Sequence, residues 1–371
     1  FFVSLSSFFA GILNSNNKFA AAAAAPIILN IILILSLLIS YSFQFDFAKN
    51  LSYGVTLSGL FQLIFLIYFT NKYYKPRLKI NPAITLKVKF FFKKLLPSIF
   101  SSGVTQINIL IGTIIASFEA GAVSYLYYAD RVYQINLAIA GIAVSTVSLP
   151  VLAKAIKKKN KLLIHKIQNK TIELCLLLSV PASLGLIIAS EEIVNSLFGY
   201  GSFSKENVIA TAKALKYFGY GIPAFALIKV LSNFFFARDN TKIPFYLSFL
   251  IVILNVIISL SLFKQIGFII IPIATSVSTW IGVMLYFIFL RKYLSFLFKL
   301  NFIKTILKIF ISTLLMSAIL TIGLDYFTES LDYFNKYKSI YLLFIVSFVA
   351  TIYLISCYLL GVLKIKNYKT N

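Results

Sequence analysis

Two neighbouring ionisable residues, Asp130 and Arg131, stand near the start of an apolar stretch that runs from residue 123 to residue 152. An ionised side chain at the centre of a membrane helix costs about 2.5 to 3.5 kcal/mol on insertion scales, and such groups usually face an internal cavity. Neighbours on a helix point about 100° apart, so Asp130 and Arg131 cannot simply neutralise each other and must find separate partners. The alternative for Arg131 is an interfacial anchor, because it lies only about two turns into the stretch.

A further cation, Lys229, lies in another apolar stretch, roughly 18 Å along its helix when counted from residue 217. Its ammonium either faces a cavity or snorkels to the membrane surface on its flexible stem. The amides of Gln134 and Asn136 follow Arg131 by about one turn, and amides also serve as contacts between helices. Taken together, these groups indicate a polar, cationic interior that suits an anionic substrate. Phosphates are the first candidates, because a guanidinium pairs with them through two hydrogen bonds.

Residues for enzymatic chemistry are scarce. Cys175 and Cys357 are the only cysteines and both lie in apolar stretches, which argues against a disulfide framework and a thiolate metal site. The single histidine, His165, sits in a lysine-rich segment typical of a solvated loop, which leaves little for zinc binding or a Ser-His-Asp relay. The sequence contains no glycine-rich phosphate loop and no nucleophile with an adjacent base. We therefore expect a transporter without catalytic residues, metal or cofactor.

The composition predicts an integral membrane protein. Hydrophobic residues make up 60% of the 371 residues, and charged residues only 12%, about half of what soluble domains carry. The formal net charge of +24 raises the question of nucleic acid, but the lysines lie in short clusters between apolar runs rather than on one polar face. The phospholipid bilayer is therefore the expected partner, and nucleic acid is not.

Ten apolar runs reach spanning length, for which about 20 residues are needed, and a shorter run at 1–13 precedes them. The alternation of a membrane barrel is missing, so the runs predict helices. We expect an all-α, polytopic membrane protein with ten full spans and one partial span. The ten runs are 21–43, 53–70, 95–118, 123–152, 171–189, 217–236, 243–263, 267–290, 303–323 and 340–363.

Charged residues alternate from loop to loop. Lysine and arginine gather at 72–94, 154–170, 238–242, 291–308 and 364–369, whereas most acids lie in the intervening loops. The positive-inside rule places the basic loops and the C-terminus in the cytoplasm. The chain opens with Phe1, Phe2 and Val3, without a methionine or the features of a signal peptide, so we expect a fragment that lacks its N-terminus.

Several short motifs follow one another at characteristic spacing. GILN at 11–14 precedes Phe19 and Pro26, QIN lies at 106–108, YYADR at 127–131 and SLPVLAK at 148–154. KVL at 229–231 then leads into ARDNTKIP at 237–244. Together these segments resemble the MurJ/MviN lipid II flippases of the multidrug/oligosaccharidyl-lipid/polysaccharide exporter (MOP) superfamily. The combination of YYADR with the later SLPVLAK is the most specific part of the resemblance.

The resemblance implies a MOP-type transporter fold of fourteen helices, arranged as two inverted lobes and two C-terminal helices. The first three helices would be missing from this chain. Residues 1–94 would then be the remainder of the N-lobe, 95–290 the six-helix C-lobe, and 291–371 a two-helix extension that flanks a groove for a polyprenyl tail.

The resemblance also implies a central cationic cavity that alternates between the two sides of the bacterial inner membrane. It would carry lipid II, the undecaprenyl-pyrophosphate-linked peptidoglycan precursor, to the periplasmic leaflet during cell wall biogenesis and shape maintenance. Arg131 matches the family's cavity arginine on its eighth helix, with Ser124, Asp130 and Gln134 beside it, and Lys229 lies in a matching motif. The cell-division and elongation machinery is a further implied partner. The family's cavity residues on its first two helices would lie outside this chain.

Two alternatives and one additional site accompany this interpretation. The nearest alternative is a flippase for another polyprenyl-linked saccharide, such as an O-antigen unit. A membrane glycosyltransferase or acyltransferase is the alternative from another class. The family's sodium site uses acids where this chain carries Gly112 and Ser259, so only Asn255 and Thr275 remain as a possible ion site.

Overall fold

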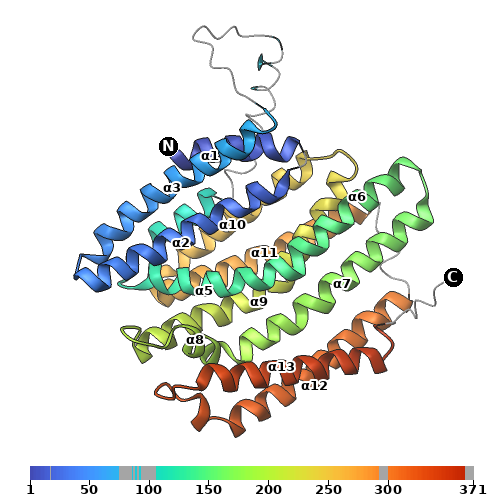
Figure 1. Ribbon diagram of the computed structural model, residues 1–371. Helices are drawn as coiled ribbons and strands as arrows, with labels where there is room; N and C mark the ends of the chain where they lie inside the picture. The colour runs from blue at the N-terminus through green and yellow to red at the C-terminus, as the bar shows by residue number, and fades with distance from the viewer. Residues whose placement is uncertain are drawn as a thin grey trace, which may run out of the picture. The chain divides into compact units, whose positions relative to one another are not determined.

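The computed structural model describes residues 1–16, 18–74, 86, 88–89, 92, 106–291 and 300–363, and every regular element in these residues is a helix. A helix satisfies its own backbone hydrogen bonds, which is required in hydrocarbon. Figure 1 shows the long helices of this arrangement. The prediction of an all-α, polytopic protein is confirmed. The chain divides into two compact units, Phe1–Phe90 and Phe91–Asn371, and the finer division into two lobes and an extension stays a prediction.

The first unit contains three helices: α1 (Phe2–Ser15), α2 (Phe19–Phe43) and α3 (Phe47–Asn71). Helix α3 begins where the Asp46 carboxylate accepts the Lys49 N–H at 2.9 Å, an ordinary N-cap. The Asn50 amide then donates to the Ser36 carbonyl and to the Ser40 hydroxyl, both at 2.7 Å. These bonds join α2 to α3 within the membrane, where packing alone provides little hydrophobic driving force.

The second unit is built around α9 (Lys205–Phe236), the most buried of the described spanning helices. Helices α5, α7 and α11 pack against it. The elements in chain order are a short apolar helix Gln106–Ala116, α5 (Ala122–Leu137), the π-helix η1 (Ala138–Ala143), α6 (Val144–Lys157), α7 (Lys161–Ile188), α8 (Ser190–Phe198), α9, α10 (Lys242–Ile266), the 3₁₀ turn η2 (Gly267–Ile269), α11 (Ile270–Leu290), α12 (Leu300–Tyr326), the 3₁₀ turn η4 (Glu329–Leu331) and α13 (Lys338–Leu359).

Within the described part of the chain, helices occupy nine of the ten predicted spans. The tenth, 95–118, is described from residue 106 onward and contains the helix Gln106–Ala116. Two helices begin well before their apolar runs. Asn160 caps α7 by accepting the Leu163 N–H at 3.0 Å, and Ser204 caps α9 by accepting the Asn207 N–H at 3.3 Å. The apolar run marks the part of a helix in hydrocarbon, whereas the cap marks where its hydrogen bonding begins.

Helices α5 and α6 form one spanning rod that is interrupted by the π-helix η1. Gly141 in η1 lies against α9, because a Cβ at this position would approach the Ala226 Cα to 3.1 Å. Asn233 of α9 donates to the Ser145 carbonyl at 2.6 Å just beyond η1. The absence of a side chain at Gly141 therefore permits the close packing that holds the rod on α9.

A buried lysine at the start of α13 forms hydrogen bonds with the C-terminal end of α8. The Lys338 side chain is fully buried, and its ammonium donates to the Asn195 Oδ1 at 3.0 Å and to the Gly199 and Tyr333 carbonyls at 2.7 Å each. The rings of Tyr200 and Tyr333 lie 4.3 and 4.7 Å from the ammonium nitrogen. Three oxygen acceptors and two aromatic faces thus compensate the desolvation of the charge.

A polar cavity of about 310 Å³ lies beside this contact, between α8, the start of α9 and the end of α12. Burial raises the pKa of the Glu192 carboxyl, and the neighbouring carboxylates of Glu191 and Asp325 add to this effect. Glu192 is consequently protonated at a higher pH than an exposed glutamate. As pH rises, ionisation of Glu192 adds a further negative charge beside Glu191 and Asp325 in this cavity.

We expect Lys338→Met to destabilise the protein, because Asn195, Gly199 and Tyr333 would each lose a buried donor, at roughly 1 to 3 kcal/mol for each acceptor left unpaired. The midpoint of thermal unfolding in detergent should fall by several degrees. Lys336→Met, which removes an exposed lysine two residues away, is the matched control and should leave the midpoint unchanged. Equal midpoints for the two variants would contradict a stabilising role for Lys338.

Candidate functional site

The rotation of α5 about its axis is fixed by aromatic packing. The Tyr133 ring stacks on Phe218 at 5.4 Å and meets Phe225 edge-on at 5.2 Å, and both phenylalanines belong to α9. Ala129 and Val132 are buried on the same side of α5. Residues on the opposite side of the helix must therefore remain exposed in this unit.

That exposed side carries most of the predicted site. Ser124, Tyr127, Arg131 and Gln134 are all exposed and follow one another at three- or four-residue spacing, so they form one stripe on α5. Asp130 is half-buried at the edge of the stripe. The structure thus brings four of the five predicted substrate-binding residues together on about three turns of one helix.

Asp130 and Arg131 have separate partners, as the sequence predicted. The Arg131 guanidinium donates to the Tyr127 hydroxyl at 3.0 Å and lies 4.6 Å from the centre of the same ring. The Gln134 amide donates to the Asp130 carboxylate. Among the residues that the structure describes, no carboxylate forms an ion pair with Arg131. The guanidinium is therefore held in place while its charge stays available to an incoming anion.

Lys229 is exposed on α9, on a different helix from the other four residues. Ser232, one turn further on, donates to the Tyr286 hydroxyl of α11 at 2.9 Å. No hydrogen bond or ion pair joins Lys229 to the α5 stripe in the described ranges. Its exposure agrees equally with a cavity-facing and with a snorkelling ammonium.

The two residues of the predicted ion site lie together. The Asn255 amide nitrogen donates to the Asn108 Oδ1 at 2.9 Å and to the Thr275 hydroxyl at 3.3 Å, and the Asn255 Oδ1 accepts from Ser259 at 3.3 Å. A sodium ion needs several converging oxygens. Here an N–H₂ group occupies the centre, and these neutral groups satisfy one another. The hydrogen bonds show that these residues lie together, and the ion site stays a prediction.

Tyr127 is the residue that sequence reasoning did not assign to the site. Its position four residues before Arg131 was the available signal, because residues i and i+4 are neighbours on a helix and tyrosine attracts a guanidinium through its ring. The adjacent Tyr128 has a different role, since its ring packs against Phe198 and Phe203 at 4.8 and 5.2 Å.

Solved structures place this fold in a class. An inward-facing multidrug resistance MATE family transporter of the MOP superfamily is similar with a TM-score of 0.66 at 14% identity, over 78% of this chain and 68% of that one. A lipid II flippase MurJ in an inward closed conformation is similar with a TM-score of 0.79 at 25% identity, over 96% of this chain and 71% of that one. The fold is that of a polytopic transporter of the MOP superfamily.

The chain belongs to the MurJ lipid II flippase family, because the family model described as Lipid II flippase MurJ matches residues 1–363. A probable lipid II flippase MurJ of Rhizobium meliloti (strain 1021) is 40% identical over 77% of this chain. Another, of Rickettsia prowazekii (strain Madrid E), is 34% identical over 89% of it. The chain spans 54% and 65% of the lengths of these relatives. Family and apolar helices together identify a multi-pass inner-membrane protein.

We expect Tyr127→Phe to weaken the binding of a lipid pyrophosphate about 2- to 10-fold, since one net hydrogen bond that orients Arg131 is worth roughly 0.5 to 1.5 kcal/mol. Tyr127→Leu removes the ring as well and should weaken it further. Titration of the purified chain with farnesyl pyrophosphate measures both effects. Tyr220→Phe, at another exposed tyrosine, is the control and should bind like the unmodified chain. Unchanged affinity in Tyr127→Leu would contradict the positioning role.

Proposed function

We propose that this chain contributes to a flippase that moves lipid II from the cytoplasmic to the periplasmic leaflet by alternating access. The observation that carries this proposal is the exposed Arg131 guanidinium. It is hydrogen-bonded to the Tyr127 hydroxyl and lies over the Tyr127 ring, while the Asp130 carboxylate accepts a hydrogen bond from Gln134. A cation without an ion pair among the described residues is costly inside a spanning helix, and binding an anion relieves that cost.

A pyrophosphate fits this site better than a carboxylate or a neutral sugar. Its oxygens match the planar fork of a guanidinium, and its charge exceeds what a single cation can neutralise. Lys229 of α9 supplies a second cation in our proposal, and the hydroxyl of Ser124 and the amide of Gln134 supply neutral hydrogen-bonding groups. The similarity to probable lipid II flippases favours lipid II over another polyprenyl-linked saccharide.

The C-terminal helices α12 and α13 would serve the lipid tail. Ile309 and Leu320 of α12 pack with Leu342 and Val349 of α13, and the outward side chains of both helices are large and apolar. A polyprenyl chain is itself apolar, so it gains contacts along such a surface without desolvating polar groups. The headgroup and the tail would then be bound by different parts of the molecule.

The orientation and the cellular partners also belong to the proposal. The basic ends of α6 and α7 and the C-terminus would face the cytoplasm, by the positive-inside rule. The protein would act in peptidoglycan biosynthesis together with the cell-division and elongation machinery.

Replacing Arg131 by Ala should abolish growth support by the gene that encodes this chain, in cells depleted of their own flippase. Each charge-assisted hydrogen bond to the pyrophosphate is worth roughly 1.5 to 3 kcal/mol, so headgroup affinity should fall about 10- to 100-fold. Lys229→Met should also impair growth, and Lys229→Arg less so, because Arg retains the charge.

The matched control for these variants is Lys213→Met, an exposed lysine near the other end of α9. Protein in the membrane fraction should be equal for all variants. Normal growth with Arg131→Ala would contradict the binding role and show that Arg131 is an interfacial anchor. Arg131 lies roughly 35 Å from Lys154 along the rod, which is about the thickness of the membrane. Normal growth with Lys229→Met would assign that lysine to snorkelling.

Single cysteines should reveal the orientation, in a background in which the buried Cys175 and Cys357 are replaced. Cysteines at Ser202 and Thr328 should react with an impermeant thiol reagent added to intact spheroplasts. A cysteine at Lys158 should react only after permeabilisation, because the basic end of α6 faces the cytoplasm. Labelling at Lys158 from outside would reverse the orientation.

A further inference from the structure

An apolar groove of about 530 Å³ lies between the rod of η1 and α6 and the antiparallel helix α7. Ile139, Val147 and Val151 line one side of it, and Ile167 and Leu178 line the other. All residues that line it belong to the second unit. Val147 is 72% exposed and Ile139 56%, so the groove opens outward instead of being closed by protein.

The dimensions of the groove match one leaflet of a bilayer. At 1.5 Å per residue, the lining residues extend roughly 18 Å along the rod and roughly 16 Å along α7. The hydrocarbon layer of one leaflet is about 15 Å deep, half of the whole core. A single extended acyl chain would therefore lie along the groove over most of its length.

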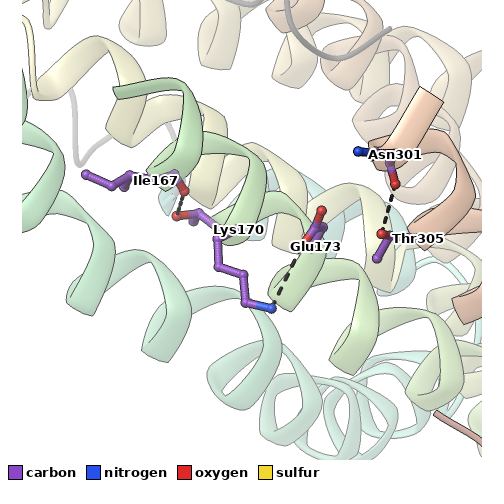
Figure 2. Close-up of polar contacts among 6 residues, drawn as sticks. Ile167, Lys170, Glu173, Asn301 and Thr305 are labelled. Atoms are coloured by element: carbon purple, nitrogen blue, oxygen red, sulfur yellow. Dashed lines mark hydrogen bonds and ion pairs between the residues drawn. The ribbon is translucent and has the colours of Figure 1, made fainter. Parts of the chain in front are cut away.

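Positive charge is concentrated at one end of the groove. Lys170 lines this end, and its side chain is 58% exposed. It pairs with Glu173 on the same helix at 3.8 Å, as Figure 2 shows, a long distance for an exposed ion pair of little strength. Lys154 is exposed one turn beyond Val151 on the facing helix.

The surrounding sequence adds to the positive charge at this end of the groove. Between Arg131 and Glu191, Glu173 is the only acidic residue, against seven lysines. These lysines are Lys154, Lys157, Lys158, Lys159, Lys161, Lys166 and Lys170. Basic pockets between spanning helices near a membrane surface attract anionic headgroups.

We propose that this groove binds an anionic glycerophospholipid of the surrounding leaflet, with one acyl chain between α6 and α7 and its phosphate at Lys170. The phosphate would take over Lys170 from Glu173, since a charge-assisted hydrogen bond to a phosphate is stronger than an ion pair at 3.8 Å. A zwitterionic lipid fits less well, because the lysines around the groove leave its own ammonium with Glu173 alone. The site is distinct from Arg131 and from the surface of α12 and α13.

The occupant is a membrane lipid rather than the transported one in this proposal, because the charged end lies at the lysine-rich end of the rod, far from Arg131. The lipid would fill the space between α6 and α7 while the helices keep their spacing. This proposal does not depend on the identity of the transported substrate.

Native mass spectrometry of the delipidated chain, after addition of phosphatidylglycerol or phosphatidylcholine, tests the proposal. The unmodified chain should retain at least about fivefold more phosphatidylglycerol, by the attraction of Lys170 and its neighbours. Lys170→Gln should reduce this preference to less than about twofold by the same reasoning. Val147→Trp fills the groove from an exposed position and should abolish retention of both lipids.

Two controls match these variants: Lys213→Gln removes an exposed lysine elsewhere, and Leu260→Trp places a tryptophan on the exposed side of α10. Both should retain phosphatidylglycerol like the unmodified chain. Equal retention of the two lipids, or full retention by Val147→Trp, would overturn the proposal. A parallel series with undecaprenyl phosphate covers the other occupant. Loss of that lipid alone in Val147→Trp would assign the groove to the substrate tail and reject a membrane lipid.

Discussion

The packing of Tyr133 between two phenylalanines of α9 determines which side chains of α5 are exposed on the second unit. It turns the alanine and valine side of α5 toward α9, and it leaves Ser124, Tyr127, Arg131 and Gln134 on the opposite side. A rotation of α5 by one residue would bury the guanidinium against apolar side chains, at a prohibitive desolvation cost. An aromatic contact that touches no charged group thus decides where the charge of Arg131 lies.

The amino-acid sequence predicts the spanning segments well and the ends of the helices poorly. Apolar runs report contact with hydrocarbon, so they locate α10, α11, α12 and α13 closely. They give no information about Asn160 and Ser204, whose caps extend α7 and α9 beyond the apolar runs. The π-helix was equally beyond prediction, because AIAGIA is as compatible with an α-helix, and the close approach of Gly141 to Ala226 involves a helix more than 80 residues away in the sequence.

In the second unit, contacts between residues close in the sequence could be predicted, whereas contacts between distant residues could not. The partners of Asp130 and Arg131 lie four residues away, and helix geometry alone predicts that such neighbours meet. Lys338 illustrates the other case, since its acceptors include Asn195 and Gly199, about 140 residues distant. No periodicity in the sequence distinguishes that buried lysine from the exposed Lys336. Asn255 and Thr275 lie between these cases, because their contact follows once α10 and α11 are recognised as antiparallel neighbours.

The π-helix also sets the angular register of the rod formed by α5 and α6. Exposed side chains recur four residues apart at Tyr127, Arg131, Ile135, Ile139, Ala143, Val147 and Val151. On a regular α-helix a four-residue step overshoots one turn, so seven such positions would wind around to the far side. The wider turn at 138–143 absorbs part of that overshoot. The side of α5 that carries Arg131 and the side of α6 that carries Val147 therefore lie closer in angle than they would on a regular α-helix.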